Sequence, residues 1–344
     1  MLPGKDGDCL LLEYGDDEIT KRMLIDGGRA GTYPEIVPTL ANVMEAGGHL
    51  DVLVITHVDQ DHILGVLALM EDEDRPAIDD VWFNGFDQLM DVDPALESFG
   101  PRDGELLTTA LLTQGVPWNA AFEGRAVEVG RPMELPDDGS TITLLSPDRS
   151  LLEALIGDWT EECAKEGLIP GRDPDEPPPK GFEEFGTLDI EELAETAFER
   201  DGSKTNRTSI GFLFEHGGVR IMFTGDGDDP RLVTSVRPFA EAEGGRLRLD
   251  ALKVSHHGSR KNLSRDLLDL IDCPRYLIST NGDRHDHPDP VAMARILKYG
   301  GDQKELIFNY AERAADWDVA EWKETYGYTV TTPDPDGFVT LDWG

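Results

Sequence analysis

Cysteine is scarce in this sequence: the 344 residues include three cysteines, Cys9, Cys163 and Cys273, and no C-x-x-C pair. Their wide spacing argues against a disulfide framework and against a zinc site built from thiolates. Long apolar runs are also missing, since stretches such as 52–56 and 210–214 fall far short of the roughly 20 residues of a membrane helix. The N-terminus lacks the basic and apolar regions of a secretion signal. We therefore expect a soluble, cytoplasmic protein that does not bind a membrane.

Basic residues are few as well, because 31 lysines and arginines stand against 69 acidic residues and give a formal net charge of −38. A chain with this charge repels polyanions, so nonspecific binding to nucleic acid through a basic surface is disfavoured. Any activity on nucleic acid would need a local groove lined by basic residues or metal ions. The excess of acid is otherwise explained by a well-solvated surface and identifies no partner.

Two segments of the chain resemble each other, Cys9–Gly28 and Ile210–Asp228. In each, an apolar run meets a turn rich in glycine or aspartate, and a second apolar run ends in an aspartate followed by glycine. This pattern predicts two β-hairpins, each delivering a carboxylate at the end of a strand. The pair indicates that the two halves of the chain repeat one α/β unit.

The remaining pattern predicts an α/β chain in which strands alternate with helices. Strands are expected at 50–56, 80–84, 141–145, 252–255, 275–280 and 337–343. Helices are expected at 34–46, from His62 onward, and at 150–167, 263–271 and 290–299. A stretch rich in proline, glycine and acid predicts an exposed loop insertion at 169–187.

Four side chains that commonly bind metals crowd into six positions directly after the strand expected at 50–56: His57, Asp59, Asp61 and His62. A turn between a buried strand and a helix can point all four inward, at the edge where open α/β sheets place their sites. Two buried carboxylates this close would repel each other unless protons or cations neutralise them. Imidazole with carboxylate and no thiolate fits Zn²⁺, Mn²⁺ or iron.

This pattern resembles the H-x-H-x-D-H signature of the metallo-β-lactamase superfamily, in the H-x-D-x-D-H form of its ComEC-like members, the hydrolase domains of DNA-uptake channel proteins. The family's other landmarks occur in the family's order between about Gly4 and Leu297: Gly7-Asp8, Asp26 in LIDGG, Asp226 in FTGDGD, the paired-histidine loop LKVSHHGS and His287-Pro288. The resemblance implies a single metallo-β-lactamase domain over 1–344, an αββα sandwich of two packed mixed β-sheets flanked by helices.

The resemblance also implies a site for two divalent metal ions, Zn²⁺ or Mn²⁺, with these candidate ligands: His57, Asp59, Asp61, His62, Asp226, His256 and His257. The first two would help hold one ion, the next two the other, and Asp226 would bridge them. One more histidine is expected from the paired loop, and His257 is preferred because a His-Gly pair follows the strand, with His256 left open. Residues 205–209 stand where most members carry a further histidine. Asp59 in place of a histidine favours harder ions, so Mn²⁺ rivals Zn²⁺.

Catalytic and substrate-binding roles are also expected near this site. Asp61 is expected to orient the attacking water, and His287 to orient the substrate or give a proton to the leaving group. A small basic patch and neighbouring polar residues are expected to contact a substrate phosphate, and the candidates are Asn206, Ser209, Ser259, Arg260 and Lys261. Helix capping and turn formation explain the first two of these equally well.

The chemistry of such a site is hydrolysis, because two metal ions a few Å apart lower the pKa of a bridging water toward about 7 and produce hydroxide at neutral pH. The leading hypothesis is a metal-dependent phosphodiesterase, and more narrowly a nuclease acting on DNA, as the resemblance implies. The alternative is hydrolysis of an acyl bond, as in the lactonases, thioesterases and β-lactamases of the fold. A third interpretation is a non-catalytic module that binds a protein partner. The sequence identifies neither such a partner nor an oligomeric state.

Overall fold

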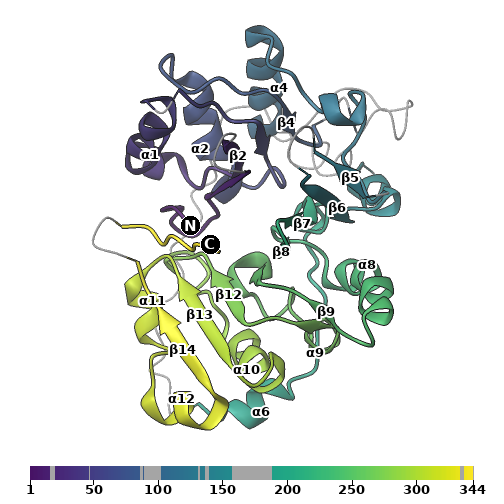
Figure 1. Ribbon diagram of the computed structural model, residues 1–344, viewed down its shortest axis with the longest axis vertical. Helices are drawn as coiled ribbons and strands as arrows, with labels where there is room; N and C mark the ends of the chain where they lie inside the picture. Colours follow the sequence, from purple (N-terminus) through teal and green to yellow (C-terminus); the bar gives the residue numbers. More distant parts are fainter. Residues whose placement is uncertain are drawn as a thin grey trace, which may run out of the picture.

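Two β-sheets form the centre of the molecule, one of four strands and one of eight. The computed structural model describes residues 1–15, 20–45, 47–85, 88, 102–130, 132–135, 139–156, 188–333 and 337–343. Figure 1 shows the early part of the chain, in purple and blue, at one end and the green and yellow part at the other, with the two termini side by side between them. No helix among these residues is long and apolar enough to cross a membrane.

The smaller sheet has the strand order β1-β2-β3-β4. Its strands are β1 (Leu10–Gly15), β2 (Thr20–Ile25), β3 (Val52–Val54) and β4 (Val81–Trp82). The first two form the predicted antiparallel hairpin, whereas β3 and β4 add in parallel. Parallel strands need a crossover, which helices supply here. The helical segments on this side are η1 (Ala30–Thr32), α1 (Tyr33–Glu45), α2 (Gln60–Glu71), α4 (Arg102–Gln114) and η2 (Ala120–Phe122).

The larger sheet has the order β14-β13-β12-β10-β8-β7-β6-β5, antiparallel from β5 to β8 and parallel from β8 to β14. Its strands are β5 (Met133–Glu134), β6 (Thr141–Ser146), β7 (Gly211–His216), β8 (Val219–Phe223), β10 (Ala251–Lys253), β12 (Arg275–Ile278), β13 (Lys304–Phe308) and β14 (Tyr328–Thr331). A separate pair joins β9 (Leu247–Arg248) to β11 (Ile271–Asp272). The helical segments are α6 (Ile190–Ala194), α7 (Lys204–Arg207), α8 (Asp229–Ala242), η3 (Ser255–Gly258), α9 (Arg265–Asp269), α10 (Pro290–Tyr299), α11 (Ala311–Ala315) and α12 (Ala320–Tyr326).

Successive side chains of a strand point to opposite faces, and this alternation builds the layers of the molecule. In β2, Met23 belongs to the apolar core between the two sheets, while Leu24 packs in the core beneath α1 and α2. In β7, Phe212 lies in the core between the sheets, while Leu213 packs with side chains of α8 and α10. The layers therefore run helix, sheet, sheet, helix. The predicted αββα arrangement of two packed mixed sheets flanked by helices is confirmed.

Most predicted elements are found within a few residues of their expected bounds, but the strand predicted at 337–343 is wrong. Val339 exchanges two backbone hydrogen bonds with Met1, at 2.7 and 3.0 Å, and no regular ladder follows within 337–343. A strand needs repeated pairing along its length, which a single exchange does not supply. The helix predicted at 150–167 is observed over 149–156. Its remainder, with Cys163, and the insertion predicted at 169–187 lie outside the described residues.

The topology repeats in the way the two hairpins predicted. In each half, the second hairpin strand, β2 or β8, is followed by a helix, α1 or α8, and then by a parallel neighbour, β3 or β10. The histidine motifs follow β3 and β10, and the two aspartates that end the hairpins follow β2 and β8. All four segments therefore leave the carboxyl ends of parallel strands, where α/β sheets gather functional side chains.

Candidate metal centre

The first histidine motif occupies the junction between β3 and α2. The strand is buried on both faces, so the chain leaves it from the interior. His57 lies in the connecting turn and is buried, while Asp61 and His62 stand in the first turn of the helix, which begins at Gln60. A helix N-terminus favours negative charge, which suits a carboxylate at Asp61. The side chain of Asp59 is the most exposed of the four, at 36%.

The second hairpin delivers Asp226 to the same place. The turn after β8 passes through Gly225, whose φ is +49°. A Cβ atom on this glycine would lie 3.0 Å from Cβ of Thr56, so its absence lets the two motif loops approach each other. Asp226 is buried as a result.

The paired histidines after β10 share a strained backbone. His256 and His257 have φ angles of +48° and +54°, in the left-handed region that residues with a Cβ rarely adopt. Such conformations cost on the order of 1–3 kcal/mol each and are concentrated at functional sites. With this backbone, both side chains reach Asp226. The sequence left open which of the two histidines is a ligand, and the structure brings both to the site.

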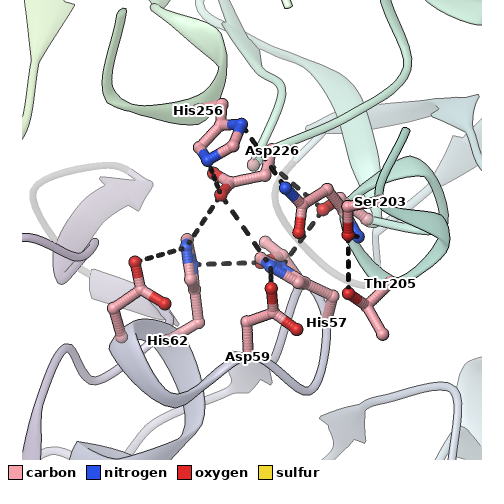
Figure 2. A network of polar contacts seen from close by, with 12 residues as sticks. His57, Asp59, His62, Ser203, Thr205, Asp226 and His256 are labelled. Carbon is pink, nitrogen blue, oxygen red and sulfur yellow. Dashed lines mark hydrogen bonds and ion pairs between the residues drawn. The ribbon is translucent and has the colours of Figure 1, made fainter. Parts of the chain in front are cut away.

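Four imidazole rings converge on the carboxylate of Asp226. Its Oδ2 lies 3.9 Å from Nε2 of His57, 3.4 Å from Nε2 of His62 and 3.6 Å from Nε2 of His256. Its Oδ1 lies 3.6 Å from Nε2 of His257. Figure 2 shows Asp226 between His256 on one side and His57 and His62 on the other.

The other ring nitrogen of each histidine is held by a neighbour. Nδ1 of His62 faces Oδ2 of Asp26 at 2.7 Å, and Nδ1 of His257 faces the carbonyl oxygen of Ser279 at 2.8 Å. Nδ1 of His256 faces Oδ1 of Asn262 at 2.9 Å, and Nδ1 of His57 lies 3.1 Å from the hydroxyls of both Thr56 and Ser209. Partners of this kind fix the ring and its tautomer and direct Nε2 toward a metal ion.

The atoms at the centre of the cluster are those that a cation would satisfy. Nε2 of His57, His62 and His257 and Oδ1 of Asp226 are buried and have no hydrogen-bond partner. Buried polar atoms are costly when they are left unpaired, so four together fit a site that binds a cation. The donor set is imidazole and carboxylate, which fits Zn²⁺ or Mn²⁺.

The candidate ligands can be divided into two groups that share Asp226. The Asp61 group consists of Asp61, His62 and His257, whose ligand atoms all lie within 4.8 Å of one another. Oδ2 of Asp61 is 3.5 Å from Nε2 of His257 and 3.9 Å from Nε2 of His62. The His57 group consists of His57, Asp59 and His256; Oδ2 of Asp59 lies 3.7 Å from Nε2 of His57. Each group together with Asp226 could hold one divalent ion.

The charges of the cluster stabilise one another. Burial alone would raise the pKa of Asp226, but the facing His256, His257 and His62 outweigh it and hold this pKa well below its usual range. Burial would likewise lower the pKa of His257, but Asp226 and Asp8 raise it to about 10. The carboxylates thus favour protonated rings at His62, His256 and His257, and a metal ion would have to displace those protons to bind.

The predicted substrate-binding residues divide between the interior and the rim. Ser209 is buried, and its hydroxyl lies near His57 and accepts a hydrogen bond from the backbone N–H of Asp226, which fits support of the ligands better than substrate contact. Nδ2 of Asn206 donates to Asp201 at 3.0 Å and lies 3.4 Å from Nδ1 of His256. Ser259 is buried and accepts a hydrogen bond from the backbone N–H of Lys261.

Arg260 is exposed and Lys261 partly exposed, whereas His287 packs against the cluster. The side chain of Arg260 is half exposed and lies 3.6 Å from Oδ2 of Asp289. The ring of His287 packs against His256 with centroids 5.3 Å apart, and its buried Nδ1 has no hydrogen-bond partner. Burial and the neighbouring His256 and His257 hold the pKa of His287 well below its usual range, so this ring is uncharged at neutral pH.

Sequence reasoning missed the residues that hold the ligands from behind. Asp201 and Ser279 had no local signal, because each contacts its histidine across a long stretch of chain. Asn262 lies only six residues after His256, but no role was assigned to it. Asp8 and Lys253 had a signal, since they lie in the Gly7-Asp8 pair and in LKVSHHGS, but no role was assigned to either.

Comparisons with known proteins add little to this geometry. No family model matches the chain, and no curated protein matches it. Among solved structures, the metallo-β-lactamase fold protein YhfI from Bacillus subtilis is 12% identical with a TM-score of 0.41, over 98% of this chain and 96% of that one. Zn²⁺-bound PqqB from Methylobacterium extorquens is 14% identical with a TM-score of 0.39, over 96% and 86%. A CmlA β-hydroxylase mutant is 15% identical with a TM-score of 0.37, over 94% and 52%. Scores this low assign neither family nor activity, so function rests on the site itself.

Proposed function

We propose that this chain is a hydrolase that depends on two divalent metal ions, Zn²⁺ or Mn²⁺, and that it cleaves phosphodiesters. The observation that carries the proposal is the convergence of four imidazole Nε2 atoms on Asp226, with buried atoms of the cluster left without hydrogen-bond partners. A purely structural core would satisfy these atoms within the protein. Ions held there would lower the pKa of a bound water and neutralise charge on the attacked group.

The residues of the chain divide the remaining work among them. Asp226 faces histidines of both ligand groups, since its Oδ2 lies near His57 and His62 and its Oδ1 near His257, so its carboxylate could join the groups. Asp61 is partly exposed beside His257 and is placed to accept a hydrogen bond from the attacking water. His287 is uncharged and is placed to hydrogen-bond the substrate or its leaving group, because a neutral ring beside the cluster does not repel bound cations.

The choice of a phosphodiester rests on the basic side chains beside the paired histidines. Arg260 and Lys261 follow His257 by three and four residues, and Arg260 is half exposed. Guanidinium and ammonium groups at the rim of a site favour an anionic substrate. The net charge of −38 opposes long-range attraction of DNA, so any DNA substrate would depend on this patch and on the metal ions.

The test combines metal analysis with two classes of substrate. Protein purified without chelator is analysed for bound metal and assayed on bis-p-nitrophenyl phosphate, on linear DNA and on p-nitrophenyl acetate, with added Mn²⁺ or Zn²⁺. We expect about two ions per chain and diester cleavage that is lost in the variant Asp61→Ala/His62→Ala. Arg260→Ala/Lys261→Ala is expected to raise KM for the diesters with little change in metal content.

The outcomes separate the competing functions. Two ions with ester cleavage but no diester cleavage would overturn the phosphodiesterase in favour of an acyl hydrolase. Absence of both metal and activity would overturn the enzyme and favour a module that binds a partner. Diester cleavage that survives Asp61→Ala/His62→Ala would show that the activity arises elsewhere.

A further inference from the structure

The Gly7-Asp8 pair lies before β1, far in sequence from both histidine motifs, yet the fold inserts it between them. A Cβ atom on Gly7 would lie 1.6 Å from the carbonyl oxygen of Asp61, so only glycine allows the two backbones this close. The carbonyl oxygen of Gly7 accepts a hydrogen bond from the hydroxyl of Ser279 at 2.9 Å. The backbone of Ser279 in turn holds Nδ1 of His257. Gly7 therefore contacts the supports of two members of the Asp61 group.

Asp8 reaches the same histidine with its side chain. Its Oδ2 lies 2.6 Å from Nζ of Lys253, and both side chains are almost fully buried, at 2% and 1% exposure. Its Oδ1 lies 3.3 Å from Nδ1 of His257 and has no hydrogen-bond partner. Burying an ion pair is costly unless the surroundings use its charges. Here the carboxylate stands behind a candidate ligand, with Lys253 anchoring it to the strand β10 that carries the paired histidines.

The His57 group offers an internal match for this arrangement. Oδ2 of Asp201 lies 3.4 Å from Nδ1 of His256, nearly the distance that separates Asp8 from His257. Asp201 is fixed differently, by hydrogen bonds from the backbone of Ser203 and the side chain of Asn206. Each of the paired histidines therefore has its own carboxylate, and the two carboxylates belong to different ligand groups.

We propose that Gly7-Asp8 is a positioning element for one of the two ions: Gly7 sets the backbone at Asp61, and the Asp8–Lys253 pair orients His257 for metal binding. The inference rests on the proposed function in that it takes the cluster to be a metal centre. It assigns Asp8 to the ion of the Asp61 group and Asp201 to the ion of the His57 group.

The test measures binding of Mn²⁺ alone to the full chain after chelator treatment, by calorimetry and by electron paramagnetic resonance. The double variant His57→Ala/Asp59→Ala serves as background, because it leaves the Asp61 group as the one complete group. In this background Asp8→Asn is expected to weaken Mn²⁺ binding by about 10–100-fold, the usual effect of losing a residue that orients a ligand. Asp201→Asn is the matched control and is expected to leave this affinity unchanged.

A further variant guards against simple loss of folding, since Asp8→Asn leaves Lys253 buried without its partner. Asp8→Asn/Lys253→Met removes both charges and is expected to fold, as judged by circular dichroism and thermal unfolding, while Mn²⁺ affinity stays reduced. Wild-type affinity in Asp8→Asn or in this double variant, or an equal loss in Asp201→Asn, would overturn the inference. If these binding results hold but no diester is cleaved, the proposed function fails and the positioning role stands. If the wild-type chain binds no Mn²⁺, the inference fails, and if it binds no Zn²⁺ either, the proposed function fails with it.

Discussion

Asp26 and Asp226 both lie in the turn that follows the second strand of a hairpin, and yet their carboxylates have opposite surroundings. Asp26 is saturated: it accepts hydrogen bonds from the backbone and hydroxyl of Thr56 at 2.8 Å each and faces Nδ1 of His62 at 2.7 Å. Asp226 faces four imidazole Nε2 atoms and keeps one oxygen without a hydrogen-bond partner. The fold thus delivers a carboxylate twice, and the neighbours decide whether it supports the structure or binds a ligand.

The residue after the adjoining strand explains the difference. Thr56 and Ser255 follow β3 and β10 at equivalent positions, and both carry a hydroxyl. The hydroxyl of Thr56 donates to Asp26, whereas that of Ser255 donates to the carbonyl oxygen of Gly227. Asp226 therefore receives no bond from its counterpart hydroxyl and stays available at the centre of the site.

The largest effect is expected from removing the charge of the available carboxylate. Asp226→Asn keeps the shape of the side chain but cannot join the two ligand groups. We expect metal-dependent hydrolysis to fall by at least about 100-fold, since losing residues that merely orient ligands already costs 10–100-fold. Added Mn²⁺ should raise the melting temperature of the wild-type chain, because an ion that binds the folded state stabilises it, but not that of the variant. Asp266→Asn, at an exposed position of α9, is the control; a wild-type response to Mn²⁺ in Asp226→Asn would contradict the comparison.

An effect on stability rather than on activity is expected from the saturated carboxylate. Asp26→Asn replaces one acceptor oxygen by an amide that points a donor at donors, in a fully buried position. Breaking a buried charged contact from one side costs about 3 kcal/mol or more, so the free energy of unfolding should fall by about that amount. Urea unfolding in the presence of chelator measures this loss without any contribution from metal. An unchanged unfolding free energy would show that Asp26 is not the structural partner that the comparison requires.

The sequence predicted the residues that converge but only part of what holds them. The two hairpins, the αββα layers and the position of the histidine motif after β3 follow from apolar periodicity and from a turn rich in metal-binding side chains. These signals are local, so a sequence pattern contains them. The sequence pattern could not show that both His256 and His257 reach Asp226. Their approach depends on two successive residues in the left-handed backbone conformation, which alternation along a strand does not predict.

Supporting contacts at long sequence separation could not be predicted as contacts. Ser209 was expected near the site, but as a substrate contact, and nothing around it indicates that it supports His57 across 152 residues. The strands β13 and β14 were also missed. They extend the larger sheet beyond β12 by regular parallel pairing. The error at 337–343 has the same origin, since apolar alternation there finds Met1 as its partner rather than a neighbouring strand.

The smallest effect concerns a second pair of corresponding residues. Arg29 lies three residues after Asp26, and Asp229 lies three residues after Asp226. Arg29 is paired with Asp6, whereas Asp229 is buried at the start of α8, where burial raises its pKa to about 6 despite a hydrogen bond from the backbone of Ser264. The folded state therefore binds this proton more tightly than the unfolded state, whose pKa is about 3.9. Stability from this group is present below about pH 4 and is lost as the pH rises through about 6.

Asp229→Asn should remove that loss, because an uncharged amide can still accept the bond from Ser264. Relative to the wild type, the variant is expected to gain about 1–2 kcal/mol in unfolding free energy between pH 4.5 and pH 7.5, less than the full shift at 1.36 kcal/mol per pKa unit because the site relaxes around the charge. Urea unfolding of both proteins at the two pH values, in chelator, gives the difference directly and cancels the titration of all other groups. A difference that stays constant or shrinks as the pH rises would mean that Asp229 is solvated or paired in the folded protein. In that case Asp229 and Arg29 would differ in residue type, but the burial of Asp229 would not lower the stability of the folded protein at neutral pH.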